Sequence, residues 1–333
     1  MDTPLSRPLS QPPRVRLARL PTPLEAMDRL SVELGGPRIW IKRDDLTEGP
    51  ASGNKLRKLE FSVGQALEQN STVLVTAGGV QSNHCRATAI VAAKLGLKSH
   101  LILRGKPPIE SDGNLLLDEL VGAEITFATA EQFENLDSLF DDINNDYRAK
   151  GEVPFNIPIG ASDEIGLWGY IECARELKAD FVAHSISPDH IISATGSGGT
   201  QGGMILGNHL HGLDTQVAAF NVSNDENFFK QKIAEDIKRW QSRYQESVPE
   251  LPINIIDGYV GPGYGRADAH VFDTIRRVAR AEGIIFDPVY TGKAFDGMLQ
   301  ELNKGRFSGA TDIVFLHTGG IYGLFPQRHQ FSK

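Results

Sequence analysis

The chain has 333 residues, enough for about two domains, and its hydrophobic content of 40% is ordinary for a globular protein. The formal net charge of −8 argues against nucleic acid as the main partner, because binding to a phosphate backbone requires clustered basic residues. No apolar run approaches the roughly 18 residues that span a bilayer, which argues against a membrane-spanning protein.

The cysteine content favours a reducing compartment. Cys85 and Cys173 are too few for a disulfide framework, and neither lies in a zinc-binding spacing, so no metal is expected. The first twenty residues contain four arginines and four prolines. Transit peptides are also rich in arginine, but the prolines disfavour the amphipathic helix that such peptides form. The cytoplasm is therefore the expected location, with organelle targeting as the alternative.

An irregular arm is expected at residues 1–20, followed by a helix. Thr22 can cap this helix, Pro23 suits its first position, and Glu25 three residues after Thr22 completes a capping box. Residues 38–42 then read as a short strand. Asp44 and Asp45 after it are interpreted as a turn in which one aspartate pairs with a nearby base.

Strands and helices alternate in the rest of the chain. Nearly continuous apolar runs such as residues 72–76 are typical of strands buried on both faces of a parallel sheet. The expected strands are residues 72–76, 99–103, 124–127, 190–194, 216–220, 253–256 and 312–316. The expected helices are residues 87–95, 114–121, 131–150 and 166–178, and residues 221–250 are expected to form a surface helix pair. The alternation predicts open α/β sheets that bind ligands at the carboxyl ends of their strands.

Lys55 is the first candidate for a chemical role. It follows the turn dipeptide Gly53-Asn54 at the start of a predicted helix, and Arg57 and Lys58 lie close to it in the sequence. Neighbouring positive charge lowers the pKa of a lysine and favours a nucleophilic amine. The same residues would also fit a solvated helix end, so the interpretation depends on the rest of the chain.

A glycine-rich segment, residues 195–203 (TGSGGTQGG), joins a predicted strand to a helix. Glycines allow backbone N–H groups to surround an anion, and the start of the following helix adds partial positive charge. Ser197 and Thr200 supply further donors. No Gly-Lys-Ser/Thr follows, and Gln201 replaces the third glycine of GxGxxG, so a small phosphate fits better than a triphosphate or a dinucleotide. A nucleophilic lysine and a phosphate cup together match the needs of pyridoxal 5′-phosphate (PLP).

Four motifs carry a resemblance to a known family. They are residues 52–60 (SGNKLRKLE), 81–84 (QSNH), 195–200 (TGSGGT) and 287–293 (DPVYTGK). In this order they resemble the D-cysteine desulfhydrase/1-aminocyclopropane-1-carboxylate (ACC) deaminase family of PLP enzymes, over about residues 14–328. The resemblance implies fold type II, similar to the tryptophan synthase β chain, with two open twisted α/β domains and the cofactor between them. Residues 1–54 and 163–333 would form the larger PLP-binding domain and residues 55–162 the smaller one, and a homodimer is expected.

The resemblance also implies roles for individual residues. Lys55 resembles the lysine that forms the Schiff base and takes the α-proton, and Asn83 resembles the partner of the cofactor's phenolic oxygen. Tyr290 resembles the tyrosine that stacks on the pyridine ring, and Tyr264 a second active-site tyrosine. The remaining implied contacts are with the cofactor phosphate, by Gly196, Ser197, Gly198, Gly199 and Thr200, and with the substrate, by Ser82, Asn83, His84 and Thr318.

Two positions bear on the choice of substrate. The resemblance places Thr291 beside the pyridine nitrogen, where ACC deaminases have a glutamate that keeps the nitrogen protonated. A neutral hydroxyl gives a weaker electron sink, which suffices for the elimination of a β-thiol. Thr318 stands where ACC deaminases have leucine. Both positions favour conversion of D-cysteine to pyruvate, hydrogen sulfide and ammonia, with either tyrosine as proton donor to the sulfur. ACC deaminase, L-cysteate sulfo-lyase and a non-catalytic PLP or amino-acid binding protein are the alternatives.

Overall fold

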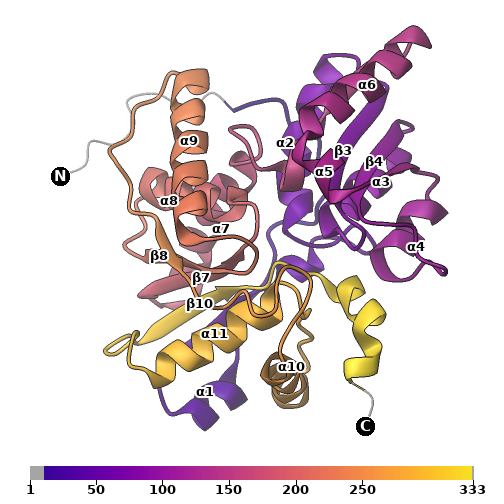
Figure 1. The fold of residues 1–333 in the computed structure, drawn as a ribbon. Helices are drawn as coiled ribbons and strands as arrows, with labels where there is room; N and C mark the ends of the chain where they lie inside the picture. Colours follow the sequence, from indigo (N-terminus) through magenta and orange to yellow (C-terminus); the bar gives the residue numbers. More distant parts are fainter. Residues whose placement is uncertain (1–10, 332–333) are drawn as a thin grey trace.

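The structure, a computed structural model, describes residues 11–331, which form two α/β units side by side (Figure 1). The arginine- and proline-rich beginning of the chain therefore lies partly outside the described residues. A six-stranded sheet has the order β1-β2-β10-β7-β8-β9, and a four-stranded sheet has the order β5-β4-β3-β6. Neighbouring strands run parallel except for the antiparallel pair β1–β2.

The strands are β1 (Leu24–Ala26), β2 (Arg38–Lys42), β3 (Val73–Gly79), β4 (Lys98–Arg104), β5 (Glu124–Ala128), β6 (Pro154–Asn156), β7 (His190–Thr195), β8 (Gln216–Asn221), β9 (Asn254–Ile256) and β10 (Asp312–Leu316). The helices are α1 (Asp28–Leu34), α2 (Asn54–Glu68), α3 (Asn83–Lys94), α4 (Gly113–Leu120), α5 (Ala130–Glu134), α6 (Leu136–Ala149), α7 (Trp168–His184), α8 (Gly199–His211), α9 (Glu226–Tyr244), α10 (Ala269–Glu282) and α11 (Thr291–Asn303), with the 3-10 segments η1 (Asp44–Leu46), η2 (Ile159–Ala161) and η3 (Ile321–Gln330).

Helices cover both faces of the six-stranded sheet. Residues of α7, α8 and α9 form one apolar core with one face, and residues of α1, α10 and α11 form a second core with the other face (Figure 1). Most residues of the central strands are buried, as the apolar runs in the sequence predict for a covered parallel sheet. Among the described residues, no helix has the length and apolar character needed to cross a membrane.

All eight predicted strands are present and β6 was not predicted, but three helix predictions are wrong. Residues 24–26 form β1 instead of a helix, because the Thr22 hydroxyl that was expected to cap it is buried and bonded to Asp44 and Arg57. The predicted helix at residues 131–150 is divided at Asn135 into α5 and α6. Residues 221–250 contain the single helix α9 instead of a pair.

The two sheets divide the chain close to the predicted domain boundaries. Strands β3 to β6 lie within residues 55–162, and all other strands lie outside this range. Helix α2 contributes to both units, because Phe61 belongs to the core under α7 whereas Leu56 and Leu59 pack against the four-stranded sheet unit. The assignment of residues 1–54 and 163–333 to one domain stays a prediction.

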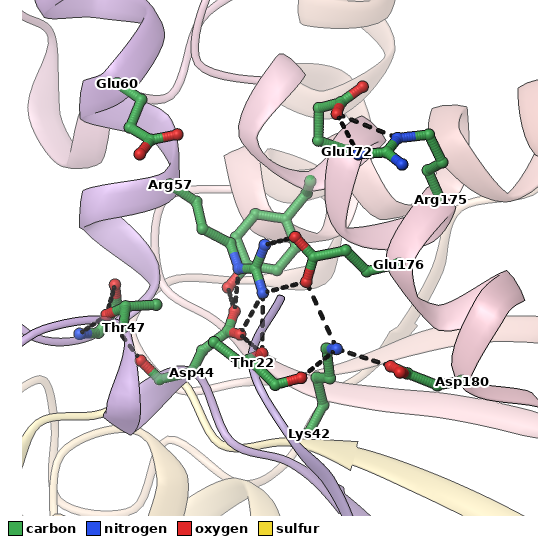
Figure 2. Close-up of polar contacts among 12 residues, drawn as sticks. Thr22, Lys42, Asp44, Thr47, Arg57, Glu60, Glu172, Arg175, Glu176 and Asp180 are labelled. Carbon is green, nitrogen blue, oxygen red and sulfur yellow. Dashed lines mark hydrogen bonds and ion pairs between the residues drawn. The ribbon is translucent and has the colours of Figure 1, made fainter. Parts of the chain in front are cut away.

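A buried ion network holds α2 to the six-stranded unit. The Arg57 guanidinium contacts both carboxylate oxygens of Asp44 at 2.8 and 2.9 Å and both of Glu176 at 2.9 Å (Figure 2). It also donates to the Thr22 hydroxyl at 2.9 Å, so all three guanidinium nitrogens have partners. Arg57 is 1% exposed and Asp44 is fully buried, so water does not screen the pairing.

The network extends beyond Arg57. Tyr170 of α7 donates to Asp44 at 2.6 Å. The Lys42 ammonium lies 3.4 Å from Glu176 and 2.7 Å from Asp180 (Figure 2). Burial alone would raise the pKa of Asp44, but Arg57 and the Tyr170 hydrogen bond lower it below its ordinary value. This confirms the pairing of an aspartate in the 44–45 turn with a base, whereas Arg57 does not join a cationic cluster around Lys55.

We expect Arg57→Met to destabilise the protein strongly. Removing one partner of a buried, hydrogen-bonded ion pair typically costs about 3–5 kcal/mol, because the remaining charges are left uncompensated. Arg239 pairs with Glu235 on the exposed surface of α9, so Arg239→Met is a matched control with an expected cost of less than about 1 kcal/mol. Thermal unfolding of both variants measures the difference, and equal melting temperatures would contradict the anchoring role.

Candidate active site

A cavity of about 830 Å³ lies between the two sheet units. Its wall takes residues from the start of α2, from the β3–α3 loop, from the β7–α8 loop and from the loops that follow β9 and β10. These loops follow the carboxyl ends of parallel strands, where open α/β sheets bind their ligands. The predicted residues on the wall are Lys55, Ser82, Asn83, His84, Gly196, Ser197, Gly198, Thr200, Tyr264, Tyr290 and Thr318.

Lys55 is half-buried at the start of α2 and lies on the cavity wall. Burial lowers its pKa to about 8, and a contact with Lys58 opposes this effect. The direction agrees with the sequence prediction, but the cause is desolvation instead of repulsion by neighbouring charge. Arg57 points to the opposite side of α2, into the network with Asp44 and Glu176.

The glycine cup begins where β7 ends. The ring of Tyr290 lies so close to Gly196 that a Cβ there would be 2.9 Å from a ring carbon, so only glycine fits. The Thr200 hydroxyl accepts a hydrogen bond from the Asn54 side chain at 3.0 Å and keeps its own proton available for an anion. Backbone N–H groups in the first turn of α8 lack intrahelical partners, which adds donors to the cup.

Ser162 lies directly behind the cup. Its hydroxyl oxygen accepts from Lys58 and from the Gly199 backbone N–H, both at 3.2 Å, and lies 2.8 Å from the Ser197 hydroxyl. The Ser162 proton can go to the Ser197 hydroxyl at 2.8 Å or to the Gly160 carbonyl at 3.4 Å, and the first arrangement leaves the Ser197 proton for an anion. Gly199 faces Ser162 and is not on the cavity wall, so its predicted contact with a phosphate is not supported.

Ser82, Asn83 and His84 lie at the start of α3. The Ser82 hydroxyl caps the helix by accepting from the Cys85 N–H at 3.1 Å, and its own proton remains available. Ser82 can therefore donate to a carboxylate. Asn83 also lies on the wall, and its side-chain oxygen is 3.3 Å from Arg86.

His84 is a neutral acceptor on this side of the cavity. Burial, followed by the charges of Lys55 and Lys58, holds its pKa well below the ordinary value. Its Nε2 lies 2.8 Å from the Thr76 hydroxyl, which gives its proton to the Ile157 carbonyl, so we infer that Nε2 carries the ring proton. Nδ1 is then a bare lone pair. His84 lies on the cavity wall, and its contact with the substrate stays a prediction, although a bare Nδ1 cannot donate to a carboxylate.

Tyr264 and Tyr290 meet on the opposite wall, with their hydroxyl oxygens 2.5 Å apart. Desolvation in the cavity raises the pKa of both phenols, although Tyr264 as a whole is 45% exposed, so both are neutral acids at pH 7. The Tyr264 ring also reaches across the cavity to the end of β3, where a Cβ at Gly79 would lie 3.4 Å from it. The pair can supply or hold a proton at the mouth of the cavity.

Thr291 is not on the cavity wall. It is fully buried as the first residue of α11, and its hydroxyl donates to Asp287 at 2.7 Å. Asp287 also accepts from three backbone N–H groups of this helix start. The Thr291 hydroxyl thus bonds both the backbone N–H and the carboxylate of Asp287, and its position against a pyridine nitrogen stays a prediction.

The cavity wall that residues 11–331 form contains no aspartate or glutamate. Its charged residues are Lys55, Arg104 and Arg266. Within the same part of the chain, no cluster of three or more His, Cys, Asp or Glu could hold a metal ion.

The sequence analysis did not identify three residues that support the glycine cup. Asn54 bonds Thr200, and Lys58 and Ser162 stand behind Ser197. Lys58 could have been found from its spacing, because residues three apart on a helix lie on the same face. Ser162 had no such signal, because it comes from a distant loop.

The observed donors fit PLP. Lys55 supplies an amine with a lowered pKa, and the hydroxyls of Ser197 and Thr200 with the α8 start surround a place for a phosphate. The fold and the cavity together define an α/β enzyme that binds a phosphorylated aldehyde cofactor through a lysine.

Comparisons with known proteins agree with this class. Residues 15–319 match the family model described as pyridoxal-phosphate dependent enzyme, and the chain belongs to this family. It uses PLP, and the fold is the predicted fold type II.

Individual relatives carry two different names. A D-cysteine desulfhydrase of Yersinia pestis is 37% identical over 331 residues, with 98% of this chain and 99% of that protein covered. A protein of Thermotoga maritima that is provisionally named 1-aminocyclopropane-1-carboxylate deaminase is 40% identical over 315 residues, with 94% and 98% covered. The crystal structure of an ACC deaminase homologue superimposes with a TM-score of 0.88 at 36% identity, covering 96% of this chain and 95% of that one.

The lowered pKa of Lys55 predicts the pH dependence of cofactor attachment. With a pKa of about 8, the reactive amine fraction rises from about 10% at pH 7 to about 90% at pH 9. The rate of covalent PLP attachment to cofactor-free protein should therefore rise about tenfold over this range and then level off. Borohydride reduction followed by peptide mass mapping measures the rate. Lys55→Met is the control that should take no label, and a rate that keeps rising to about pH 10.5 would contradict the shift.

Proposed function

We propose that the protein eliminates sulfide from D-cysteine, giving pyruvate, hydrogen sulfide and ammonia with consumption of one water. The observation that carries the proposal is the absence of a carboxylate from the cavity wall of the described chain. A carboxylate would be needed to keep the cofactor's pyridine nitrogen protonated, and ACC ring opening depends on that strong electron sink. Elimination of a β-thiol needs a weaker electron sink, because the sulfur is a good leaving group.

The residues have separate tasks in this proposal. PLP supplies the electron sink when it is bound. Ser82 and Asn83 receive the substrate carboxylate, while Ser197 and Thr200 hold the cofactor phosphate and Lys58 supports Ser197 through Ser162.

Proton transfer is divided between the two walls of the cavity. Lys55, as a free amine, would take the α-proton of the substrate. The hydrogen-bonded pair of Tyr264 and Tyr290 gives a proton to the departing sulfur, and either hydroxyl can be the immediate donor.

L-Cysteate is a second candidate substrate because two arginines line the cavity. Arg104 and Arg266 are exposed residues of the cavity wall, and no carboxylate of the described wall competes for them. Such a pair of cations suits a sulfonate, which would leave as sulfite.

We infer a homodimer acting in the cytoplasm. Both cysteines, Cys85 and Cys173, are free and buried, which agrees with a reducing compartment.

The test compares four substrates with PLP-loaded protein. D-Cysteine, L-cysteine, ACC and L-cysteate are supplied at equal concentration, and sulfide, sulfite, pyruvate and 2-oxobutanoate are measured. We expect sulfide and pyruvate from D-cysteine, with kcat/KM at least about 100-fold above that for ACC, a difference of about 2.7 kcal/mol in transition-state stabilisation. Lys55→Ala should abolish turnover.

The other outcomes identify the alternatives. Faster formation of 2-oxobutanoate from ACC would contradict the proposal and favour an ACC deaminase. Sulfite release from L-cysteate would favour the sulfo-lyase. A protein that binds PLP and turns over none of the four would favour a binding role.

A further inference from the structure

The loop that carries Tyr264 has little regular structure to hold it. This Tyr264 loop, residues 257–268, connects β9 to α10 and contains four glycines with positive φ, at residues 258, 261, 263 and 265. Gly263, next to the tyrosine, has a φ of +134°, which residues with a side chain rarely adopt. Glycine-rich segments lose much conformational freedom when they are fixed, so this loop needs specific restraints.

Lys293 supplies such a restraint from outside the loop. Its ammonium donates to the Val260 carbonyl at 2.6 Å and to the Gly263 carbonyl at 2.9 Å. These two carbonyls flank the turn that leads into Tyr264. Lys293 is 2% exposed and forms no salt bridge among the described residues, while Asp287 and Asp268 favour its charge only through longer-range attraction.

Placing a charged lysine at this position costs free energy, which its hydrogen bonds must offset. Lys293 lies in the first turn of α11, where the helix dipole disfavours a cation. Burial lowers its pKa to about 8, which shows the cost of desolvation. Buried lysines usually pair with carboxylates, whereas Lys293 is held by carbonyl groups of one loop.

Helix α11 thereby connects the two tyrosines. Tyr290 is the residue directly before the helix, and Lys293 lies three residues later on the same helix start. One end of α11 thus presents the Tyr290 ring to the cavity and holds the loop that presents Tyr264.

We propose that Lys293 is a positioning residue whose ammonium ties the Val260 and Gly263 carbonyls together and so holds Tyr264 against Tyr290 on the cavity wall. The restraint on the loop is independent of the substrate. Its consequence for proton transfer to sulfur rests on the proposed function.

Lys293→Met is the informative variant, because methionine keeps most of the buried apolar stem and removes the donors. Arg266 is exposed within the Tyr264 loop, so trypsin cleavage after Arg266 reports locally on loop opening. We expect this cleavage to be at least about tenfold faster in Lys293→Met, as for a loop that has lost a local restraint. Lys238→Met, on the exposed face of α9, is the matched control and should cleave after Arg266 at the wild-type rate.

The activity readout uses a double-mutant cycle on PLP-loaded protein. Tyr264→Phe should lower kcat in the wild type and have little further effect in Lys293→Met, because the tyrosine is already displaced. Full additivity of the two losses in kcat would overturn the positioning role.

Two cleavage results would overturn the restraint itself. One is an unchanged rate after Arg266, and the other is equal acceleration at cleavage sites throughout the chain, which indicates a general loss of stability. If Lys293→Met does not fold, Lys293→Gln takes its place with the same outcomes, because its shorter amide cannot reach both carbonyls. Selective loop cleavage in a protein that is inactive on D-cysteine would keep the restraint and reject only the proposed function.

Discussion

A guanidinium buried between two carboxylates fixes the helix on which the site depends. Arg57 and Lys55 lie two residues apart on α2, so their side chains leave opposite faces of the helix. The bonds of Arg57 to Asp44 and Glu176 secure one face to the six-stranded unit (Figure 2). The other face then presents Lys55 to the cavity, with Lys58 directed to the anion cup. The strength of the buried network therefore sets how precisely the amine is placed.

Charge is separated across this part of the molecule. Carboxylates gather behind α2, where Asp44 and Glu176 neutralise Arg57, and Asp287 is occupied by the start of α11. The cavity side retains cations without carboxylate neighbours. This separation favours a phosphate in the cup and keeps His84 neutral, and desolvation favours the free amine of Lys55. It also leaves a pyridine nitrogen without an anionic partner on the described wall.

Local signals in the sequence predicted all strands of the described chain except β1 and β6, and they pointed to Lys55 and the cup as candidates, because apolar runs and a strand–glycine–helix junction act over short distances. The predictions that failed did so because contacts with residues distant in the sequence override the local pattern. Thr22 has a good capping pattern, but its hydroxyl is taken by Arg57 from a distant helix. The hydroxyl of Thr291 bonds Asp287, and Thr291 is not on the cavity wall, although the resemblance placed it at the cofactor. Lys293 belongs to a recognised motif, yet only the folded loop shows which carbonyls it holds.

The protonation state of the cofactor's pyridine nitrogen tests the central claim most directly. The protein is loaded with PLP that carries ¹⁵N in the ring, and the nitrogen chemical shift is measured in the resting enzyme near pH 7. A wall without carboxylates predicts the shift of an unprotonated pyridine. The shift of a protonated pyridinium would mean that an anionic group reaches the ring, and it would contradict the electrostatic basis for assigning D-cysteine instead of ACC as the substrate.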